Sequence, residues 1–411
     1  MATDPTYLIV GASLAGAKAA ETLRKDGFEG PVALIGDERE RPYRRPPLSK
    51  DYLIGKTDRE KIYVHPSTWY TDHDVDLRLA TEAVGIDRAA REVTLADGGR
   101  IGYSKLLLTT GSSPRRLSVP GADLEQVLYL RRASDSDRIK DTFASVSRVA
   151  VVGGGWIGLE AAAAARIAGV EVTVLEAAEL PLMGVLGREV AQVFANLHRE
   201  NGVDLRCGVS VAEITSRGGD VSGVRLADGG HVEADAVIVG VGATPNDGLA
   251  QDCGLDVDNG VLVDATLRSS DPNIYAAGDV AKALHPLLGK RIRVEHWANA
   301  RYQSVTAAKA MLGQDVTYDR VPYFYTDQFA LGMEYSGYVE PGQYDDVVFR
   351  GDVDALEFVA FWLAEERVLA GMHVNTWGVT REITDLVRSG RPVDKHRLAD
   401  PQVPLEELID A

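Results

Sequence analysis

A short pattern that occurs twice along the chain restricts its fold more than any other feature of the sequence. Residues 6–37 and 148–176 each contain an apolar strand-like segment, a glycine-rich turn, an alanine-rich segment of helical composition and a second β-branched strand. Such a unit brings its two strands into one parallel sheet, because parallel neighbours need a long crossover connection. The following segments, 75–111 and 203–244, resemble each other as well. The sequence therefore predicts an α/β fold with two Rossmann-like dinucleotide-binding domains.

The second copy of the turn has the full GxGxxG spacing, with Gly153, Gly155 and Gly158 directly after an apolar strand. The first glycine makes the bend, the second lets the backbone approach a pyrophosphate, and the third lets helix and strand pack closely. Glu176 ends the next strand, where a carboxylate can accept hydrogen bonds from an adenosine ribose. No Arg or Lys at 174–182 is available to neutralise a 2′-phosphate, which favours NADH over NADPH. A structural turn with a capping acid is the alternative interpretation.

The first copy of the turn departs from this spacing. Gly11 and Gly16 are present, but Ser13 replaces the central glycine, and Asp37 follows the second strand. A serine Cβ and hydroxyl can still lie beside a phosphate, so we interpret this turn as a second dinucleotide site.

Two nucleotide sites in one chain indicate two different nucleotides. An enzyme with NADH at one site needs an electron acceptor, and a flavin at the other site would supply it. The apolar segment 274–277 ends in Gly278-Asp279 before an expected helix, and such a turn can bring a carboxylate to the ribityl or phosphate groups of a flavin. The alternative is that Asp279 is an ordinary helix N-cap.

The pattern changes from Pro322 onward, where short alternating strands replace the glycine-rich units. We expect strands at 323–335, 346–350, 356–363 and 367–374 and a helix at about 380–388 closed by Ser389-Gly390. The predicted domains are a discontinuous FAD-binding domain (1–112 and 246–320), an NAD-binding domain (113–245) and a C-terminal α+β domain (321–411). A helix is also expected after His296-Trp297, through about Leu312.

Composition excludes several classes of protein. Lys and Arg total 44 against 61 Asp and Glu, a net charge of −17, so no basic field for nucleic acid or an anionic membrane surface is expected. The two cysteines, Cys207 and Cys253, form no CxxC pair and no zinc spacing, so neither a disulfide framework nor a metal site is predicted. We expect a cytoplasmic protein without a membrane span.

Several motifs together resemble the two-dinucleotide-binding flavoprotein superfamily, which includes glutathione reductase. They are the two glycine-rich turns, Thr109-Thr-Gly111, Gly242-Ala-Thr-Pro-Asn246 and Gly278-Asp279. Within that superfamily, Arg45-Pro-Pro-Leu-Ser-Lys50 is similar to the oxygenase-coupled NADH–ferredoxin reductases. The similarity extends into the tail, at Tyr325-Thr-Asp-Gln328 and Pro404-Leu-Glu-Glu-Leu408.

The resemblance implies the cofactor sites residue by residue. FAD contacts are expected from Gly11, Ser13, Leu14, Ala15, Gly16, Asp37, Lys50, Ala83, Thr110, Gly111, Arg131, Gly278, Asp279, His296 and Trp297. NAD contacts are expected from Gly153, Gly155, Trp156, Ile157, Gly158, Glu160, Glu176 and Gly242. Lys50, near flavin N5 and paired with Glu160, forms the expected catalytic pair, since a cation there stabilises reduced flavin. The alternative for Lys50 is a solvated lysine after a Pro-Pro turn.

The residues also separate this chain from related enzymes. Disulfide reductases and NADH peroxidases of this fold need cysteine beside the flavin, and residues 37–60 contain none. The tail after Ser389 lacks the pattern of an amphipathic membrane helix. Tyr323 and Tyr325 stand where relatives often have tryptophans near the flavin, although they also fit an ordinary β-strand with outward aromatics. A one-electron protein carrier remains as the expected acceptor.

The predicted function is FAD-dependent NADH:ferredoxin oxidoreductase. An acidic two-iron ferredoxin would carry electrons to a haem-thiolate monooxygenase or a Rieske dioxygenase, and the reductase would be a monomer or weak homodimer. A local basic patch is expected to steer the ferredoxin. Its candidate residues are Lys290, Arg291, Arg293, Arg301 and Lys309. The alternatives are a reductase of rubredoxin, quinone or oxygen, and a redox sensor similar to apoptosis-inducing factor.

Overall fold

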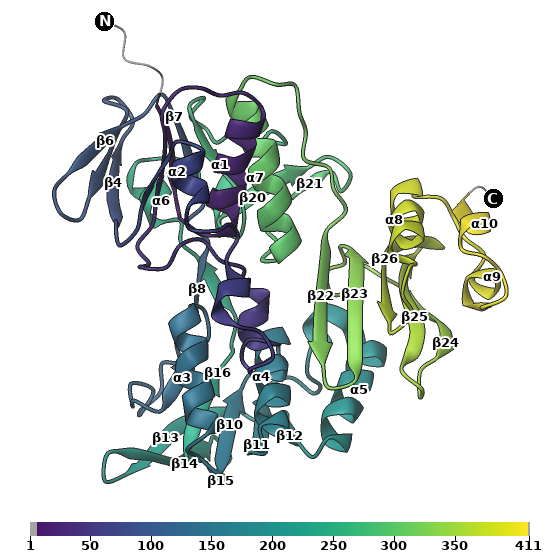
Figure 1. The fold of residues 1–411 in the computed structure, drawn as a ribbon. Coiled ribbons are helices and arrows are strands. Elements are labelled where there is room, and N and C mark those ends of the chain that lie inside the picture. The colour runs from purple at the N-terminus through teal and green to yellow at the C-terminus, as the bar shows by residue number, and fades with distance from the viewer. Residues whose placement is uncertain (1–5, 410–411) are drawn as a thin grey trace, which may run out of the picture. The chain divides into compact units, whose positions relative to one another are not determined.

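The computed structural model describes residues 6–409, which divide into two compact units (Figure 1). The first unit runs to Arg44 and continues over Arg59–Ser113 and Ala243–Arg320. The second comprises Arg45–Asp58, Pro114–Gly242 and the chain from Val321 onward.

The first unit is built on a five-stranded parallel sheet in the order β19-β7-β1-β2-β3. Its strands are β1 (Tyr7–Val10), β2 (Val32–Ile35), β3 (Val75–Arg78), β7 (Lys105–Leu108) and β19 (Ile274–Ala276). The central strands are buried apolar runs, as expected for a parallel sheet covered on both faces. Helix α1 (Leu14–Lys25) connects β1 to β2 and packs beside α7 (Trp297–Met311) (Figure 1).

The second unit repeats this arrangement with a sheet in the order β12-β11-β10-β16-β9, also parallel throughout. Its strands are β9 (Val127–Tyr129), β10 (Arg148–Val152), β11 (Glu171–Glu176), β12 (Asp204–Cys207) and β16 (Ala236–Val239). Helix α4 (Trp156–Ile167) is the crossover between β10 and β11. The two sheets correspond strand for strand, with β1 matching β10, so the predicted pair of Rossmann-like units is confirmed.

Small sheets of two or three strands accompany the five-stranded parallel sheets. One comprises β4 (Ala83–Asp87), β5 (Glu92–Leu95) and β6 (Arg100–Gly102), and its counterpart comprises β13 (Val211–Arg217), β14 (Asp220–Leu226) and β15 (His231–Glu233). The others are β8 (Ser112–Pro114) with β17 (Ala243–Pro245), and β18 (Val261–Val263) with β20 (Ala281–His285) and β21 (Lys290–Ile292).

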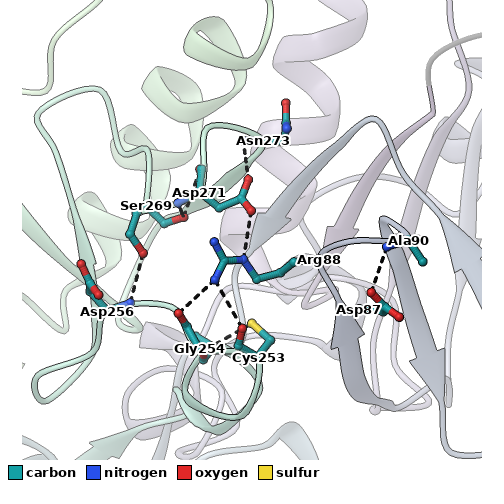
Figure 2. Close-up of polar contacts among 11 residues, drawn as sticks. Asp87, Arg88, Ala90, Cys253, Gly254, Asp256, Ser269, Asp271 and Asn273 are labelled. Atoms are coloured by element: carbon teal, nitrogen blue, oxygen red, sulfur yellow. Dashed lines mark hydrogen bonds and ion pairs between the residues drawn. The ribbon is translucent and has the colours of Figure 1, made fainter.

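Arg88, in the turn between β4 and β5, ties that ribbon to a distant part of the first unit (Figure 2). Its Nε donates to Asp271 Oδ2 at 3.0 Å, and a terminal nitrogen donates to the Gly254 carbonyl oxygen at 3.0 Å. The neighbouring thiol of Cys253 has a raised pKa, chiefly because it is partly buried. A thiol that stays protonated is a poor nucleophile.

The C-terminal segment forms an antiparallel sheet in the order β22-β23-β26-β25-β24. The strands are β22 (Tyr323–Gln328), β23 (Leu331–Gly337), β24 (Asp346–Asp352), β25 (Glu357–Ala364) and β26 (Arg367–Val374). Phe361 and Leu363 pack with Ile383 of α8 (Thr380–Ser389) in a core of their own. The predicted helix ends at Gly390, whose φ of 56° closes it in the left-handed conformation.

Helix α5 (Met183–Glu200) bends at Gly187, where φ is 76° and ψ is 174°. Trp362 Nε1 of β25 donates to the Leu186 carbonyl oxygen at 3.0 Å, so the bend lies against the C-terminal sheet. The remaining helices are α2 (Trp69–Asp72), α3 (Ala133–Phe143), α6 (Gly248–Asp252), α9 (Lys395–Ala399), α10 (Glu406–Ile409) and the 3₁₀ turns η1 (Pro46–Ser49) and η2 (Arg59–Ile62). Within residues 6–409, no helix has both the length and the apolar character that spanning a bilayer requires.

One predicted element is wrong. The sequence suggests a helix directly after Gly278-Asp279, but the chain turns there and enters strand β20. β20 pairs in parallel with β18, and this pairing satisfies the backbone groups that a helix would otherwise satisfy. Asp279 is therefore not a helix N-cap.

Candidate functional site

The first glycine of each turn is required by a close approach to a neighbouring strand. Gly11 has φ of +121° and Gly153 has φ of +102°. A Cβ on Gly11 would lie 2.2 Å from the Thr109 carbonyl oxygen, and one on Gly153 would lie 2.4 Å from the Gly240 carbonyl oxygen. Both distances are far inside van der Waals contact, so each turn needs glycine here for its own packing.

The central position of each turn is less restricted by the protein. A Cβ on Gly155 would have one neighbour within 4 Å, the Gly240 carbonyl oxygen at 3.8 Å. Gly155 has φ of −78° and Ser13 has φ of −121°, and both values suit any residue. The serine in the first copy is therefore compatible with the same backbone path.

The helices that follow both turns begin without a side-chain cap. The Ser13 hydroxyl precedes α1 but accepts no hydrogen bond from that helix, and Gly155, which precedes α4, has no side chain that could. Neither helix has an acidic residue in its first turn. Uncapped N–H groups and the positive end of the helix dipole suit a pyrophosphate, so both sites fit a dinucleotide.

The carboxylate of Glu176 lies at the second glycine-rich turn, as its position at the end of β11 predicts. Its Oε2 accepts from the Gly154 N–H at 2.5 Å and its Oε1 accepts from the Ala178 N–H at 2.7 Å. These two hydrogen bonds hold the Glu176 carboxylate beside the glycine-rich turn. The sequence misses Arg188 of α5, which donates to Glu179 Oε1 at 2.6 Å and so brings a cation to the loop after β11.

The other residues expected to contact NAD lie around the same turn. Trp156 is the first residue of α4, and its ring packs edge-on to Phe194 and Phe324 with centroids 5.5 and 5.0 Å apart. The Trp156 side chain thus packs against these two phenylalanines. Its backbone N–H lies in the first turn of α4. Ile157 is 42% exposed beside it. Gly242 accepts the Arg115 N–H through its carbonyl oxygen at 2.9 Å.

In the first unit, the residues expected to contact FAD come together from three segments. Gly278 lies close in space to the first turn of α1, since a Cβ on it would be 3.6 Å from the Ala15 Cβ. Its N–H donates to Gln303 Oε1 of α7 at 2.9 Å. Asp279 Oδ2 accepts from the Ser112 hydroxyl at 2.9 Å, which places this carboxylate beside the Gly111 turn.

His296 and Trp297 stand at the start of α7 in the same unit. Burial lowers the pKa of His296 to about 4, and the nearby charge of Asp279 opposes that shift only in part. The imidazole is therefore neutral near pH 7. The guanidinium of Arg301 lies 5.1 Å from the Trp297 ring centroid.

The remaining residues expected to contact FAD are more widely spread. Leu14 is buried in the first turn of α1, and Gly16 lies two residues later. The Thr110 hydroxyl donates to the Asn246 carbonyl oxygen. Asp37 is exposed after β2. Ala83 begins β4 in the first unit. Arg131 belongs to the second unit, where its carbonyl oxygen accepts from the Arg45 guanidinium.

Lys50 and Glu160 form an ion pair inside the second unit, with Nζ 2.7 Å from Oε1. Two prolines start η1, and Lys50 follows its last residue. The Ser136 hydroxyl of α3 donates to the Leu48 carbonyl oxygen at 2.7 Å and anchors this turn. The lysine and glutamate side chains are 11% and 4% exposed, so Lys50 is not a solvated surface lysine.

Two hydroxyl groups also donate hydrogen bonds to Glu160, and the sequence does not predict either of them. Ser49 donates to Oε2 at 2.5 Å, and Thr326 donates to Oε1 at 2.6 Å. Both belong to motifs noted above, Arg45–Lys50 and Tyr325–Gln328, but no sequence pattern joins them to Glu160. Lys50, Ser49 and Thr326 thus provide three donors to the Glu160 carboxylate.

The two tyrosines of β22 take intermediate positions. Tyr323 and Tyr325 are both partly buried, and the Lys50 Nζ lies 5.3 Å from the Tyr325 ring centroid. Burial, with the neighbouring charge of Glu334, raises the pKa of Tyr323. The Tyr325 ring therefore takes part in the Lys50 site, rather than lying on an unrelated face of the strand.

The basic residues near α7 are partly neutralised by acidic neighbours. Arg293 pairs with Glu295, and Lys309 Nζ lies 3.9 Å from Asp26 Oδ2. Across residues 6–409, no group of three or more His, Cys, Asp or Glu side chains is arranged to hold a metal ion.

Residues 5–304 match the family model described as pyridine nucleotide-disulphide oxidoreductase, and residues 323–409 match the model described as reductase C-terminal. The chain belongs to the pyridine nucleotide-disulphide oxidoreductase family. As a member of this family it is an oxidoreductase that uses FAD and NAD(H). The two glycine-rich turns described above have the packing and the free helix starts that two dinucleotides require.

Individual members of the family match over nearly the whole chain. The ferredoxin–NAD(+) reductase component of the anthranilate 1,2-dioxygenase system of Burkholderia cepacia is 38% identical, covering 100% of each chain. A rubredoxin–NAD(+) reductase of Pseudomonas putida is 37% identical, covering 90% of this chain and 95% of its own. The reductase in the crystal structure of a covalent putidaredoxin reductase–putidaredoxin complex superposes with a TM-score of 0.95 at 35% identity, covering 100% of this chain and 99% of its own.

Proposed function

We propose that this chain is the NADH-dependent ferredoxin reductase of an oxygenase system. The similarity to a ferredoxin–NAD(+) reductase component over the full length of both chains carries the proposal. When bound, FAD accepts a hydride from NADH and releases its two electrons singly, which matches a two-electron donor to a one-electron iron–sulfur acceptor. The oxygenase, haem-thiolate or Rieske, is the component downstream of the ferredoxin. Two free cysteines support a cytoplasmic location.

In this proposal the residues of the two units divide the binding tasks. The turn from Gly11 to Gly16 holds the FAD pyrophosphate at the start of α1, and Asp279 binds hydroxyl groups of the flavin. The turn from Gly153 to Gly158 holds the NADH pyrophosphate at the start of α4. Their uncapped N–H groups support both assignments.

The Lys50–Glu160 pair contributes to the reaction through electrostatics. Lys50 is the cation that stabilises negative charge on the reduced flavin ring, and Glu160 fixes where that cation points. The 2.7 Å contact and the burial of both groups support this role, because a desolvated charge acts more strongly than one in water.

We expect Glu176→Ala combined with Ala177→Arg to shift the enzyme from NADH toward NADPH. The first change removes an acceptor for the ribose hydroxyls, and the second places a cation at an exposed position beside it. Loss of a hydrogen bond to a carboxylate corresponds to about a tenfold or larger fall in kcat/KM for NADH. Steady-state kinetics with both nucleotides measure the ratio. Glu171→Ala, at the other end of β11, is the control, and an unchanged ratio in the double variant would contradict the role of Glu176.

The function is tested by rapid mixing with NADH, followed by an acceptor assay. NADH is expected to bleach the visible absorbance of the bound flavin, and cytochrome c reduction is expected to need added two-iron ferredoxin. The reductive step requires no ferredoxin, so the two measurements separate cofactor use from partner choice. Flavin that stays oxidised under NADH would overturn the proposal.

Rubredoxin is the second candidate acceptor, because a rubredoxin–NAD(+) reductase is also similar to this chain. Parallel assays with ferredoxin, rubredoxin and a quinone distinguish the acceptors. A dimer formed on adding NADH, together with slow turnover on every acceptor, would instead favour a redox sensor.

We further propose that the ferredoxin is acidic and binds near Lys290, Arg291, Arg293, Arg301 and Lys309. The charges of Arg293 and Lys309 are partly offset by Glu295 and Asp26. A patch of this kind would explain how a reductase with a net charge of −17 attracts an acidic protein.

A further inference from the structure

A chain of hydrogen bonds runs through the interior of the second unit and ends on Glu160. It begins at His198 of α5, whose Nε2 lies 2.8 Å from Gln328 Oε1. Gln328 Nε2 donates to Thr326 Oγ1 at 3.2 Å, and Thr326 Oγ1 donates to Glu160 Oε1 at 2.6 Å. The four residues are between 0% and 4% exposed. Each link is therefore shielded from competing water.

The charge of Glu160 sets the direction of this chain. A carboxylate paired with Lys50 can only accept, so the Thr326 hydroxyl must donate to it. That hydroxyl has one hydrogen, so it must accept from the Gln328 amide nitrogen. The amide oxygen then faces the histidine, and His198 must donate from Nε2.

The surroundings of His198 favour the same direction. Its Nδ1 is buried and has no hydrogen-bond partner among the described residues. A proton on Nδ1 would be an unsatisfied buried N–H, which proteins avoid more strictly than an unsatisfied acceptor. Burial also lowers the pKa of His198, which favours the neutral ring. A neutral imidazole with its proton on Nε2 satisfies every link.

We propose that His198, Gln328 and Thr326 are positioning residues that keep the Glu160 carboxylate an oriented acceptor for Lys50. The proposal rests on the role given above to the Lys50–Glu160 pair. Glu160 has donors on both oxygens, Ser49 on one and Thr326 with Lys50 on the other. The Gln328 amide donates to Thr326 Oγ1 and so directs the hydroxyl hydrogen, which otherwise turns about the Cβ–Oγ1 bond, toward Glu160 Oε1.

The first test determines the direction of the hydrogen bonds from the protonation of His198 and needs no enzyme assay. The protein is labelled with ¹⁵N-histidine, and the signal of His198 is identified among the eight histidines by its loss in His198→Phe. We expect a neutral ring protonated on Nε2 at neutral pH. A ring protonated on Nδ1, or on both nitrogens, would overturn the proposed direction.

The second test measures whether the chain acts on the reaction. In Gln328→Met the limiting rate of flavin bleaching by NADH is expected to fall about threefold to tenfold, the loss that corresponds to one hydrogen bond. The NADH concentration at half-maximal rate should change by less than about twofold, since the change does not touch the nucleotide turn. Thr326→Ser should keep the wild-type rate because the hydroxyl remains, whereas Thr326→Val should lower it.

Two further variants make the result decisive. His198→Phe combined with Gln328→Met replaces both partners by apolar groups, leaves no buried donor unsatisfied and guards against a folding defect. His373→Asn is the matched control: this histidine is equally buried and belongs to the same sheet as Gln328, but it bonds Glu334 and Thr380. A wild-type rate in Gln328→Met together with a slow Lys50→Met would overturn the positioning role. Wild-type rates in both would instead reject the proposed role of Lys50.

Discussion

Lys50→Met is expected to lower the limiting rate of flavin bleaching by NADH about a hundredfold, the typical effect of removing one preorganised charge or donor from a reacting centre. Methionine keeps much of the length of the lysine stem and its packing, but it has no charge. Glu160 keeps the hydroxyls of Ser49 and Thr326, which limits the cost of leaving its carboxylate without a cation. Rapid-mixing absorbance measures the rate, and the redox potential of the bound flavin is expected to fall with it.

Lys56→Met is the matched control for this variant. Lys56 belongs to the same segment of the second unit but is exposed, so its replacement should change neither the rate nor the potential. Thermal unfolding and the bound FAD per chain should agree among wild type and both variants. If Lys50→Met keeps the wild-type rate, Lys50 is a structural partner of Glu160 and nothing more.

Glu160→Gln separates position from charge in the same pair. The amide can still accept from one hydroxyl, but it no longer attracts Lys50 with a full charge. We therefore expect a smaller loss, on the order of tenfold, as for other groups that orient a reacting residue. A loss as large as that of Lys50→Met would mean that Glu160 itself acts on the nucleotide.

Local patterns in the sequence predict the parts of the site that lie within one strand–turn–helix unit. Gly153 and Gly158 are five residues apart in a single turn, and Glu176 lies at the end of the next strand, so spacing alone places them together. The Lys50–Glu160 pair follows from the resemblance rather than from spacing. Its partners do not follow from either, because Thr326 is 166 positions from Glu160 and His198 is 130 positions from Gln328.

The incorrect prediction of a helix after Asp279 also has its cause in contacts between distant parts of the sequence. Gly-Asp before a mixed segment is typical of a helix start when only neighbours along the chain are considered. In the fold, β18 offers an open row of backbone groups to residues 281–283, and pairing with it outweighs the local preference. Arg188 differs in this respect: it is only nine positions from Glu179, in the helix that directly follows the loop after β11, but no motif in the sequence marks the pair. The strand after Asp279 depends on a contact between segments that the sequence pattern does not connect.

Gly158→Ala and Gly155→Ala are expected to fail in different ways, and the contrast tests the nucleotide turn directly. A Cβ on Gly158 would lie 2.0 Å from the Gly153 carbonyl oxygen, which is backbone and has little freedom to move. We expect this variant to lose about 1–3 kcal/mol of unfolding free energy, as overpacked sites do, and to lose measurable reduction by NADH while FAD stays bound. A Cβ on Gly155 has ample room in the protein, so Gly155→Ala should unfold like the wild type.

Gly155→Ala should nevertheless raise the KM for NADH about tenfold, because the added methyl group occupies the space through which the backbone approaches the pyrophosphate. Gly184→Ala is the control: it lies in the first turn of α5 with no atom within 4 Å of its would-be Cβ, and it should leave both stability and KM unchanged or improve stability slightly. Thermal unfolding with FAD bound and NADH titration of the reduction rate give the two measurements. A wild-type KM in Gly155→Ala would show that the NADH phosphates do not approach this turn, even if Gly158→Ala is unstable. The pair therefore separates a glycine that the fold requires from one that the ligand requires.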